Sequence, residues 1–118
     1  MDERHEAFYK DLLASRKAEA REWLRNGTET SYRSLGEMET DPSIELVDRL
    51  YALGAEEVLA VDIKDWDRGE NTGQLLVRLP RDEAAREDLF EEQRELVEPL
   101  GFEGDEDEGQ DYLFIMLD

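Results

Sequence analysis

The sequence predicts an α+β fold, a small mixed sheet with helices packed on it. Three segments place apolar residues at three- and four-residue spacing, the pattern of a helix with one buried face. Short apolar runs of strand length lie between and after these segments. The chain has 118 residues, of which 39% are hydrophobic, and this supplies enough apolar side chains for one core. We therefore expect a single domain over residues 1–118.

The first predicted helix covers residues 3–25. It has no internal Pro or Gly, and Asn26-Gly27 ends it. Its apolar stripe contains Phe8, Leu12, Trp23 and Leu24. Residues 1–26 carry as many basic as acidic residues, whereas the remainder is acidic. Two interpretations follow: residues 1–26 are either an arm appended to an α+β core at 27–118 or the first helix of the same domain.

The next segment, 28–40, is polar and ambiguous between an irregular connection and a weak strand. A helix is predicted after it at 41–53, because Asp41 offers an N-terminal cap and Pro42 suits the first helical position. The apolar face of this helix consists of Ile44, Val47, Leu50, Tyr51 and Leu53. Gly54 ends the helix.

Two strands are predicted at 57–63 and 74–79, the second ended by Pro80. The segment between them, 64–73, is long for a hairpin loop but rich in turn-forming residues. An antiparallel hairpin is therefore the expected arrangement of the two strands.

A long helix is predicted at 82–98 with Asp82 as its cap, followed by a strand at 111–117. This strand is apolar on both faces, so we expect both faces to be covered. Helices 41–53 and 82–98 cover one side. We therefore expect residues 5–25 to lie against the other side, in the same chain or exchanged within a homodimer.

Two topologies fit this order of elements. If residues 28–35 form a strand, the chain from residue 28 onward is a ferredoxin-like βαββαβ unit preceded by the N-terminal helix. The polar character of residues 28–33 argues against an internal strand there. The alternative is a three-stranded sheet of 57–63, 74–79 and 111–117 with helices packed on it.

The charge distribution limits the classes of partner. The formal net charge is -19, and residues 81–118 alone hold 15 acidic residues against 3 basic ones. A surface this negative repels nucleic acid and anionic membranes, so we expect neither as a partner. The charge is explained either by solubility or adaptation to a salty cytoplasm, or by an anionic surface that recognises a basic protein or mimics nucleic acid. The absence of Cys and of secretory or membrane-spanning segments predicts a cytoplasmic protein.

Catalytic and cofactor motifs are not found. One His and no Cys leave no basis for Ser/His/Asp or Cys/His catalysis, and no Gly-rich phosphate loop occurs. We therefore name no catalytic residue, metal ligand or cofactor. The acidic loop with Asp105, Asp107 and Asp111, and the one with Asp65, Asp67 and Glu70, lack the EF-hand pattern. Both are interpreted as solvated turns.

Four residues are candidates for contact with a partner or ligand. Trp66 lies between Asp65 and Asp67 in the predicted loop, where a large ring often makes recognition contacts; the competing interpretation is a lid folded over the sheet. Asp62 is the one acid within an apolar strand, where a pocket could raise its pKa; the competing interpretation is a solvent-facing position.

These observations lead to two functional hypotheses. The first is a protein-interaction or regulatory module without catalysis, monomeric or homodimeric, with a basic protein as partner. The alternative is a ferredoxin-like domain that binds a small ligand, in a dimer or alone. An enzyme would need acid–base chemistry from carboxylates and Tyr alone, which no pattern supports.

Overall fold

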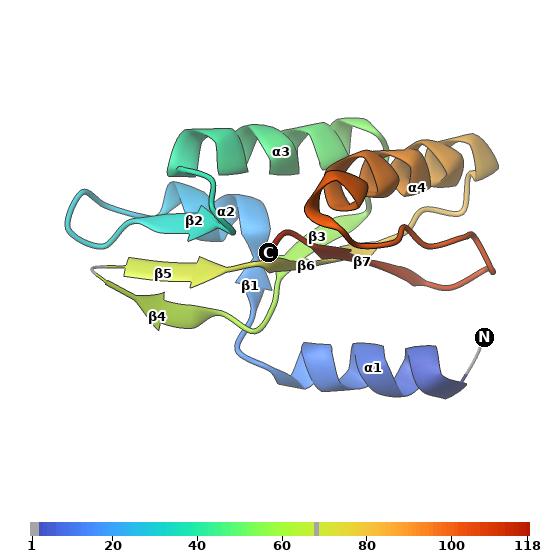
Figure 1. The fold of residues 1–118 in the computed structure, drawn as a ribbon, viewed down its shortest axis with the longest axis horizontal. Helices are drawn as coiled ribbons and strands as arrows, with labels where there is room; N and C mark the ends of the chain where they lie inside the picture. Colours follow the sequence, from blue (N-terminus) through green and yellow to red (C-terminus); the bar gives the residue numbers. More distant parts are fainter. Residues whose placement is uncertain (1–2, 68) are drawn as a thin grey trace.

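The computed structural model describes residues 3–67 and 69–118. Its fold is α+β, with two small sheets and helices packed on them (Figure 1). The helices are α1 (Glu3–Ala14), α2 (Ala20–Arg25), α3 (Thr40–Ala52), α4 (Glu83–Val97) and the 3-10 helix η1 (Glu98–Leu100). The strands are β1 (Ala18–Glu19), β2 (Arg33–Leu35), β3 (Glu57–Ala60), β4 (Lys64–Trp66), β5 (Gly69–Thr72), β6 (Gln74–Arg78) and β7 (Tyr112–Met116). In these ranges no helix has the length and apolarity to cross a bilayer.

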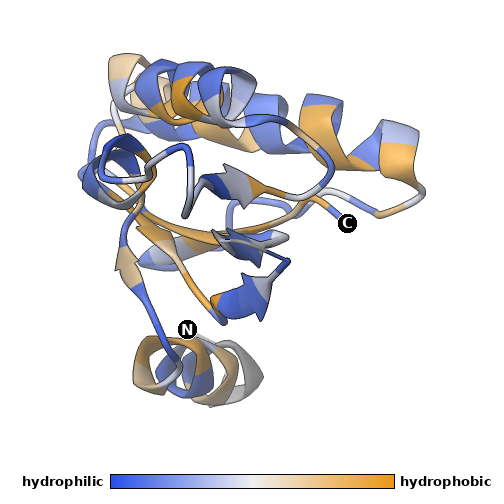
Figure 2. Cartoon of the chain, turned by 90° about the vertical axis from the view of Figure 1, so that its left-hand side faces the viewer, coloured by the Kyte–Doolittle hydropathy of each residue, from blue (hydrophilic) through white to orange (hydrophobic). Residues whose placement is uncertain are grey.

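The main sheet consists of β1, β3, β6 and β7 in that order, and every neighbouring pair is antiparallel. Helices α3 and α4 cover one face, and α1 lies across the opposite face (Figure 1). Hydrophobic residues lie along the central strands and along the helices on both sides of the sheet (Figure 2). The cluster on the α3–α4 side includes Leu50, Leu75, Phe90, Leu113 and Ile115. The cluster on the α1 side consists of Tyr9, Leu12, Leu59, Val61 and Leu76.

Strand β7 is covered on both faces, as its apolar sequence predicts. Leu113 and Ile115 are buried on the α4 side. On the other side Tyr112 and Phe114 pack against the smaller cluster, and Phe8 of α1 meets the Phe114 ring edge-on at 4.9 Å between centroids. Helix α1 therefore supplies, within the same chain, the cover that this face needs.

The continuous helix predicted at 3–25 is wrong, because the chain leaves the helix after Ala14. Ser15 Oγ accepts a hydrogen bond from the Asp62 backbone N–H at 3.0 Å, and the Arg16 carbonyl accepts one from Ile63 at 3.0 Å. Strand β1 then pairs with β3, and α2 starts only at residue 20. The Arg16 carbonyl thus has a tertiary partner in place of a helical one, and the Ser15 hydroxyl secures the same crossing.

The break divides the predicted apolar stripe between the two faces of the main sheet. Leu12 lies in the cluster on the α1 side, whereas Trp23 and Leu24 lie in the cluster on the α3–α4 side. The expectation that residues 5–25 cover the second face is thus right for α1 and wrong for α2, which packs beside α3.

The small sheet consists of β2, β5 and β4 in that order, and β2 runs parallel to β5. The weak strand predicted at 28–35 is therefore shorter and belongs to this second sheet. Its place outside the main sheet means that the strand order does not confirm a ferredoxin-like topology. The main sheet instead keeps β3, β6 and β7 as neighbours, as in the three-stranded alternative, and adds β1 at the edge.

The predicted loop 64–73 folds into a hairpin of its own, β4 and β5, with a turn at Asp67 (φ 51°). The predicted strand 57–63 correspondingly ends at Ala60, and Asp62 (φ 51°) turns the chain into β4.

The helices predicted at 41–53 and 82–98 are both present, but the N-terminal cap of the first is not the predicted residue. Helix α3 starts at Thr40, so Asp41 is not its cap; the cap is Glu39, whose side chain makes no capping hydrogen bond. Asp82 caps α4 as predicted, accepting from the Ala85 N–H at 2.9 Å. Gly54 follows α3 with φ 116°, a conformation that favours glycine.

Candidate functional site

The small sheet presents two chemically different faces. Its register aligns Arg33 with Glu70 and Glu70 with Asp65, so these three side chains share one face. Alternation places Ser34, Asn71, Lys64 and Trp66 on the other face. We call the first the inner face and the second the outer face.

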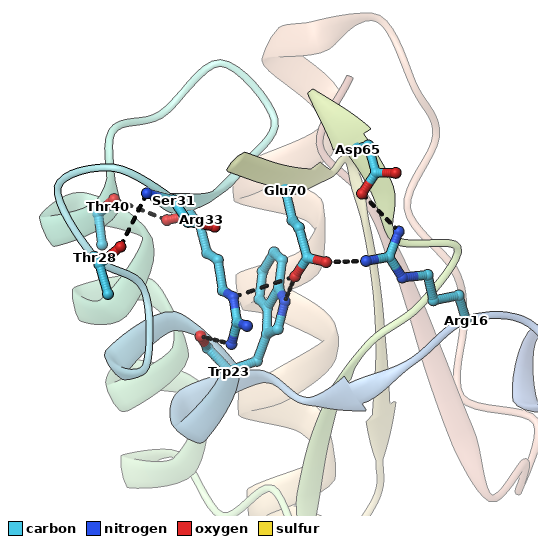
Figure 3. A network of polar contacts seen from close by, with 8 residues as sticks. All are labelled: Arg16, Trp23, Thr28, Ser31, Arg33, Thr40, Asp65 and Glu70. Carbon is cyan, nitrogen blue, oxygen red and sulfur yellow. Dashed lines mark hydrogen bonds and ion pairs between the residues drawn. The ribbon is translucent and has the colours of Figure 1, made fainter. Parts of the chain in front are cut away.

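The inner face is held by charged hydrogen bonds that converge on Glu70 (Figure 3). Glu70 Oε1 accepts a hydrogen bond from Trp23 Nε1 at 2.9 Å and lies 3.2 Å from Arg33 Nε. Glu70 Oε2 accepts from Arg16, which also donates to Asp65 Oδ1 at 3.1 Å. The side chain of Glu70 is only 18% exposed, so these partners replace most of its water. The network ties the hairpin to α2 and to the α1–β1 connection.

The outer face carries two exposed aromatic residues, Trp66 and Tyr32. Trp66 is opposite Gly69 in the hairpin, and the Gly69 backbone in turn touches Tyr32: a Cβ on Gly69 would lie 1.8 Å from the Tyr32 carbonyl oxygen. Only glycine permits this approach of β5 to the chain before β2. Tyr32 Oη donates to Asp67 Oδ2 at 3.1 Å and links β2 to the tip of the hairpin.

Two hollows flank Trp66 on this face. One, of about 370 Å³, is lined by Tyr32, Ser34, Gly36, Glu37, Met38, Trp66, Asn71 and Asp118. The other, of about 220 Å³, is lined by Asp62, Lys64, Trp66, Asn71, Thr72, Gly73, Gln74 and Asp118. Asn71 lines both hollows and is held in place by two hydrogen bonds: its Nδ2 donates to Ser34 Oγ at 3.0 Å and to the Gly36 carbonyl at 2.9 Å.

The structure places the four predicted contact residues in different surroundings. Trp66 is 67% exposed, so the interpretation as a lid over the sheet is wrong. Asp62 is half-buried at a turn rather than on the polar side of a strand, and its Oδ2 lies 3.5 Å from Lys64 Nζ. Asp65 belongs to the inner face and Asp67 to the hairpin turn. Trp66 and Asp62 are thus the pair that lines one hollow.

The acidic loop after α4 is not merely solvated, because its side chains are bound to α4. Arg86 donates to both carboxylate oxygens of Asp107, at 2.7 and 3.0 Å, and these hydrogen bonds hold the pKa of Asp107 below its ordinary value. Gln93 Nε2 donates to Asp105 Oδ2 at 2.8 Å. Among the residues that the structure describes, no group of three or more His, Cys, Asp or Glu side chains is placed to hold a metal ion.

Sequence reasoning did not identify several residues of the outer face. These residues come from three separate segments of the chain and belong to no motif: Tyr32 with Ser34, Asn71, and Asp118. The parallel pairing of β2 with β5 brings Ser34 beside Asn71, and the antiparallel pairing of β7 with β6 brings the residues after β7 to the same place. The one local signal for the site was the large ring at Trp66 between two acids.

Comparison with known proteins identifies no relative: no family model matches the sequence, and neither a curated protein nor a solved structure shows significant similarity. The chemistry of the outer face is therefore argued from its own geometry.

Proposed function

We propose that this protein is a non-catalytic interaction module that binds a basic segment of a partner protein on the outer face of the small sheet. The observation that carries this proposal is the exposure of Trp66, an indole that is 67% accessible on a regular strand while hollows open on either side of it. Aromatic anchors beside pockets carry much of the binding energy in protein interfaces.

The exposure of Trp66 is not explained by folding. A large ring gains free energy when it leaves water, and the neighbouring Met38 and Tyr32 would extend an apolar contact once a partner covered the face. The inner face of the same sheet shows that this chain can enclose an indole, because Trp23 is buried there. Trp66 is more exposed than the other large apolar side chains described as exposed, such as Leu100 at 50%, and an exposed aromatic cluster beside hollows is typical of an interface.

Charge specifies the partner. The hollows beside Trp66 are bordered by the carboxylates of Glu37, Asp62 and Asp118, against the single ammonium of Lys64. The whole chain has a formal net charge of -19. A field of this sign attracts a basic segment and speeds its encounter with the face. The same field repels nucleic acid, so we predict that the protein binds neither DNA nor RNA.

The alternative hypothesis of a small-ligand-binding ferredoxin-like domain has less support. It requires a strand order that is not confirmed, and small-ligand sites are usually deep and predominantly apolar. The hollows beside Trp66 are open and bordered by polar and charged side chains. A peptide that lies across both of them fits this surface better.

To test this, the full chain is screened for binding to an array of random dodecapeptides. We expect the selected peptides to be enriched in Arg and Lys, and Trp66→Ala to weaken their binding at least about tenfold, as for an interface anchor. Because the ring is exposed, this substitution should change the free energy of unfolding by less than about 0.5 kcal/mol, so that lost binding does not reflect lost folding.

The matched control is Phe102→Ala, which removes an aromatic ring that is 37% exposed outside the small sheet. It should leave peptide binding unchanged. Selected peptides without an excess of basic residues, or equal binding by wild type and Trp66→Ala, would refute the proposal.

A further inference from the structure

In the part of the chain that the structure describes, two partly buried arginines, Arg21 and Arg33, each contact both an aromatic ring and a carboxylate. The guanidinium of Arg21 lies over the Tyr51 ring, 4.3 Å from its centroid, while its Nε donates to Asp48 Oδ1 at 2.7 Å. The planar guanidinium is suited to this arrangement, because its face contacts the ring while its edge donates hydrogen bonds.

The second example is on the inner face of the small sheet. The guanidinium of Arg33 lies 6.0 Å from the Trp23 ring centroid, and its Nε is 3.2 Å from Glu70 Oε1. The two examples differ in ring and in carboxylate, yet both combine a cation–π contact with an ion pair. An aromatic ring beside a carboxylate is thus a combination that this protein completes with arginine.

The smaller hollow on the outer face holds a third such combination, formed by Trp66 with Asp62 and Asp118. Among the described residues no arginine lies over the Trp66 ring or pairs with these two carboxylates. The Asp118 carboxylate packs directly against Gly73: a Cβ on Gly73 would lie 1.7 Å from Asp118 Oδ1, so a side chain at position 73 would displace the carboxylate. Lys64 Nζ, 3.5 Å from Asp62 Oδ2, shows that a cationic group is accommodated at the rim.

We propose that this hollow is the subsite for one arginine side chain of the bound segment, whose guanidinium stacks on Trp66 and donates to Asp118. The proposal rests on the proposed function and specifies which side chain of the basic segment the outer face recognises. Arginine fits better than lysine because a single ammonium cannot both cover the indole face and donate two parallel hydrogen bonds to a carboxylate. The negative electrostatic field attracts arginine and lysine alike, whereas the position of the ring beside the carboxylate favours arginine.

The test uses a small probe and so does not depend on finding the partner. The indole N–H signals of Trp23 and Trp66 in heteronuclear NMR of the full chain are followed during titration with N-acetyl-arginine methylamide at constant ionic strength. We expect a saturable, millimolar shift of the Trp66 signal. The Trp23 signal serves as an internal reference, since its N–H is buried and bonded to Glu70. The neutral isostere N-acetyl-citrulline methylamide should produce no such shift, and the lysine analogue should bind more weakly.

Two substitutions examine the carboxylate. Asp118→Asn removes its charge, and Gly73→Ala displaces it without changing the net charge; both should weaken arginine binding about threefold or more, the size of one exposed cation contact. The control Glu103→Gln removes one exposed charge elsewhere and should leave the dissociation constant unchanged.

Equal shifts with arginine and citrulline, equal binding of arginine and lysine, or binding unaffected by Asp118→Asn and Gly73→Ala would overturn the subsite. If basic peptides still bind through Trp66 in that event, the proposed function stands without the subsite. If the arginine probe binds as expected while no basic peptide depends on Trp66, the subsite stands and the proposed function is wrong.

Discussion

The main sheet and the small sheet are built on opposite principles. Strands β3, β6 and β7 bury apolar side chains on both faces, against α3 and α4 on one side and α1 on the other. The small sheet has one face closed by charged hydrogen bonds to Glu70 and one face open to solvent around Trp66. Non-directional apolar burial thus stabilises the first sheet, and directed polar contacts position the second.

This difference explains why the candidate site lies where it does. A sheet that is covered on both faces has no free surface to offer a partner. The small sheet is short and needs only one face for its attachment, so its other face is available for recognition. The network around Glu70 serves that face indirectly, because it fixes the hairpin whose opposite side carries Trp66.

The largest effect is expected from a cavity in the main sheet. Leu113 of β7 is fully buried in the cluster on the α3–α4 side, and Leu113→Ala should lower the free energy of unfolding by about 2–5 kcal/mol. Urea unfolding measures this loss. The control Met116→Ala truncates a half-buried side chain of the same strand and should cost less. A loss below about 1 kcal/mol at Leu113 would contradict a core based on close packing.

A smaller effect is expected in the small sheet. Glu70→Ala leaves Trp23 Nε1 without its acceptor and Arg33 without its counter-charge, at a cost of about 1–3 kcal/mol. Glu70→Gln keeps an acceptor for Trp23 and should cost less. Amide hydrogen exchange should show faster opening of β4 and β5 in Glu70→Ala, with protection in β6 retained. Equal loss of protection in both sheets would show that the two do not differ in the way described.

The smallest effect is a pH dependence at the edge of the main sheet, where Glu19 of β1 caps α2. Burial alone raises the pKa of Glu19, but hydrogen bonds from Tyr51 Oη at 2.6 Å and from the backbone N–H groups of Glu22 and Arg21, with the charge of Arg21, outweigh it and lower the pKa. The stabilisation is therefore complete above the unfolded pKa of about 4.3 and is lost as pH falls through the lower folded pKa.

Tyr51→Phe removes the hydrogen bond to Glu19 and also the one that the hydroxyl accepts from the Val58 N–H at 2.9 Å; of the two, only the bond to Glu19 depends on pH. The stability difference between wild type and Tyr51→Phe, from thermal unfolding, should be largest near neutral pH and shrink in acid, because a protonated Glu19 is a weaker acceptor. In a Glu19→Gln background the difference should no longer vary with pH. A difference that stays constant for wild-type Glu19 would contradict the lowered pKa.

The elements that could be predicted from sequence are those whose signals are local. Asp82 marks the start of α4, and Gly54 marks the end of α3, because caps and positive φ angles act within a few residues. The apolar runs of β3, β6 and β7 predict the main sheet for the same reason. Trp66 stood out as a large ring between acids, and the composition alone set the net charge of -19.

Tertiary structure decided the rest. The helical pattern at 3–25 is broken because Ser15 and Arg16 find backbone partners after β3, a contact between segments about 47 residues apart. Apart from Leu35 and Trp66, strands β2, β4 and β5 consist of polar residues and glycine, and their mutual pairing makes them strands. Local sequence sets the conformations that a segment favours, but burial depends on the neighbours that the fold brings to it. That is why the same chain encloses Trp23 and leaves Trp66 exposed on opposite sides of one small sheet.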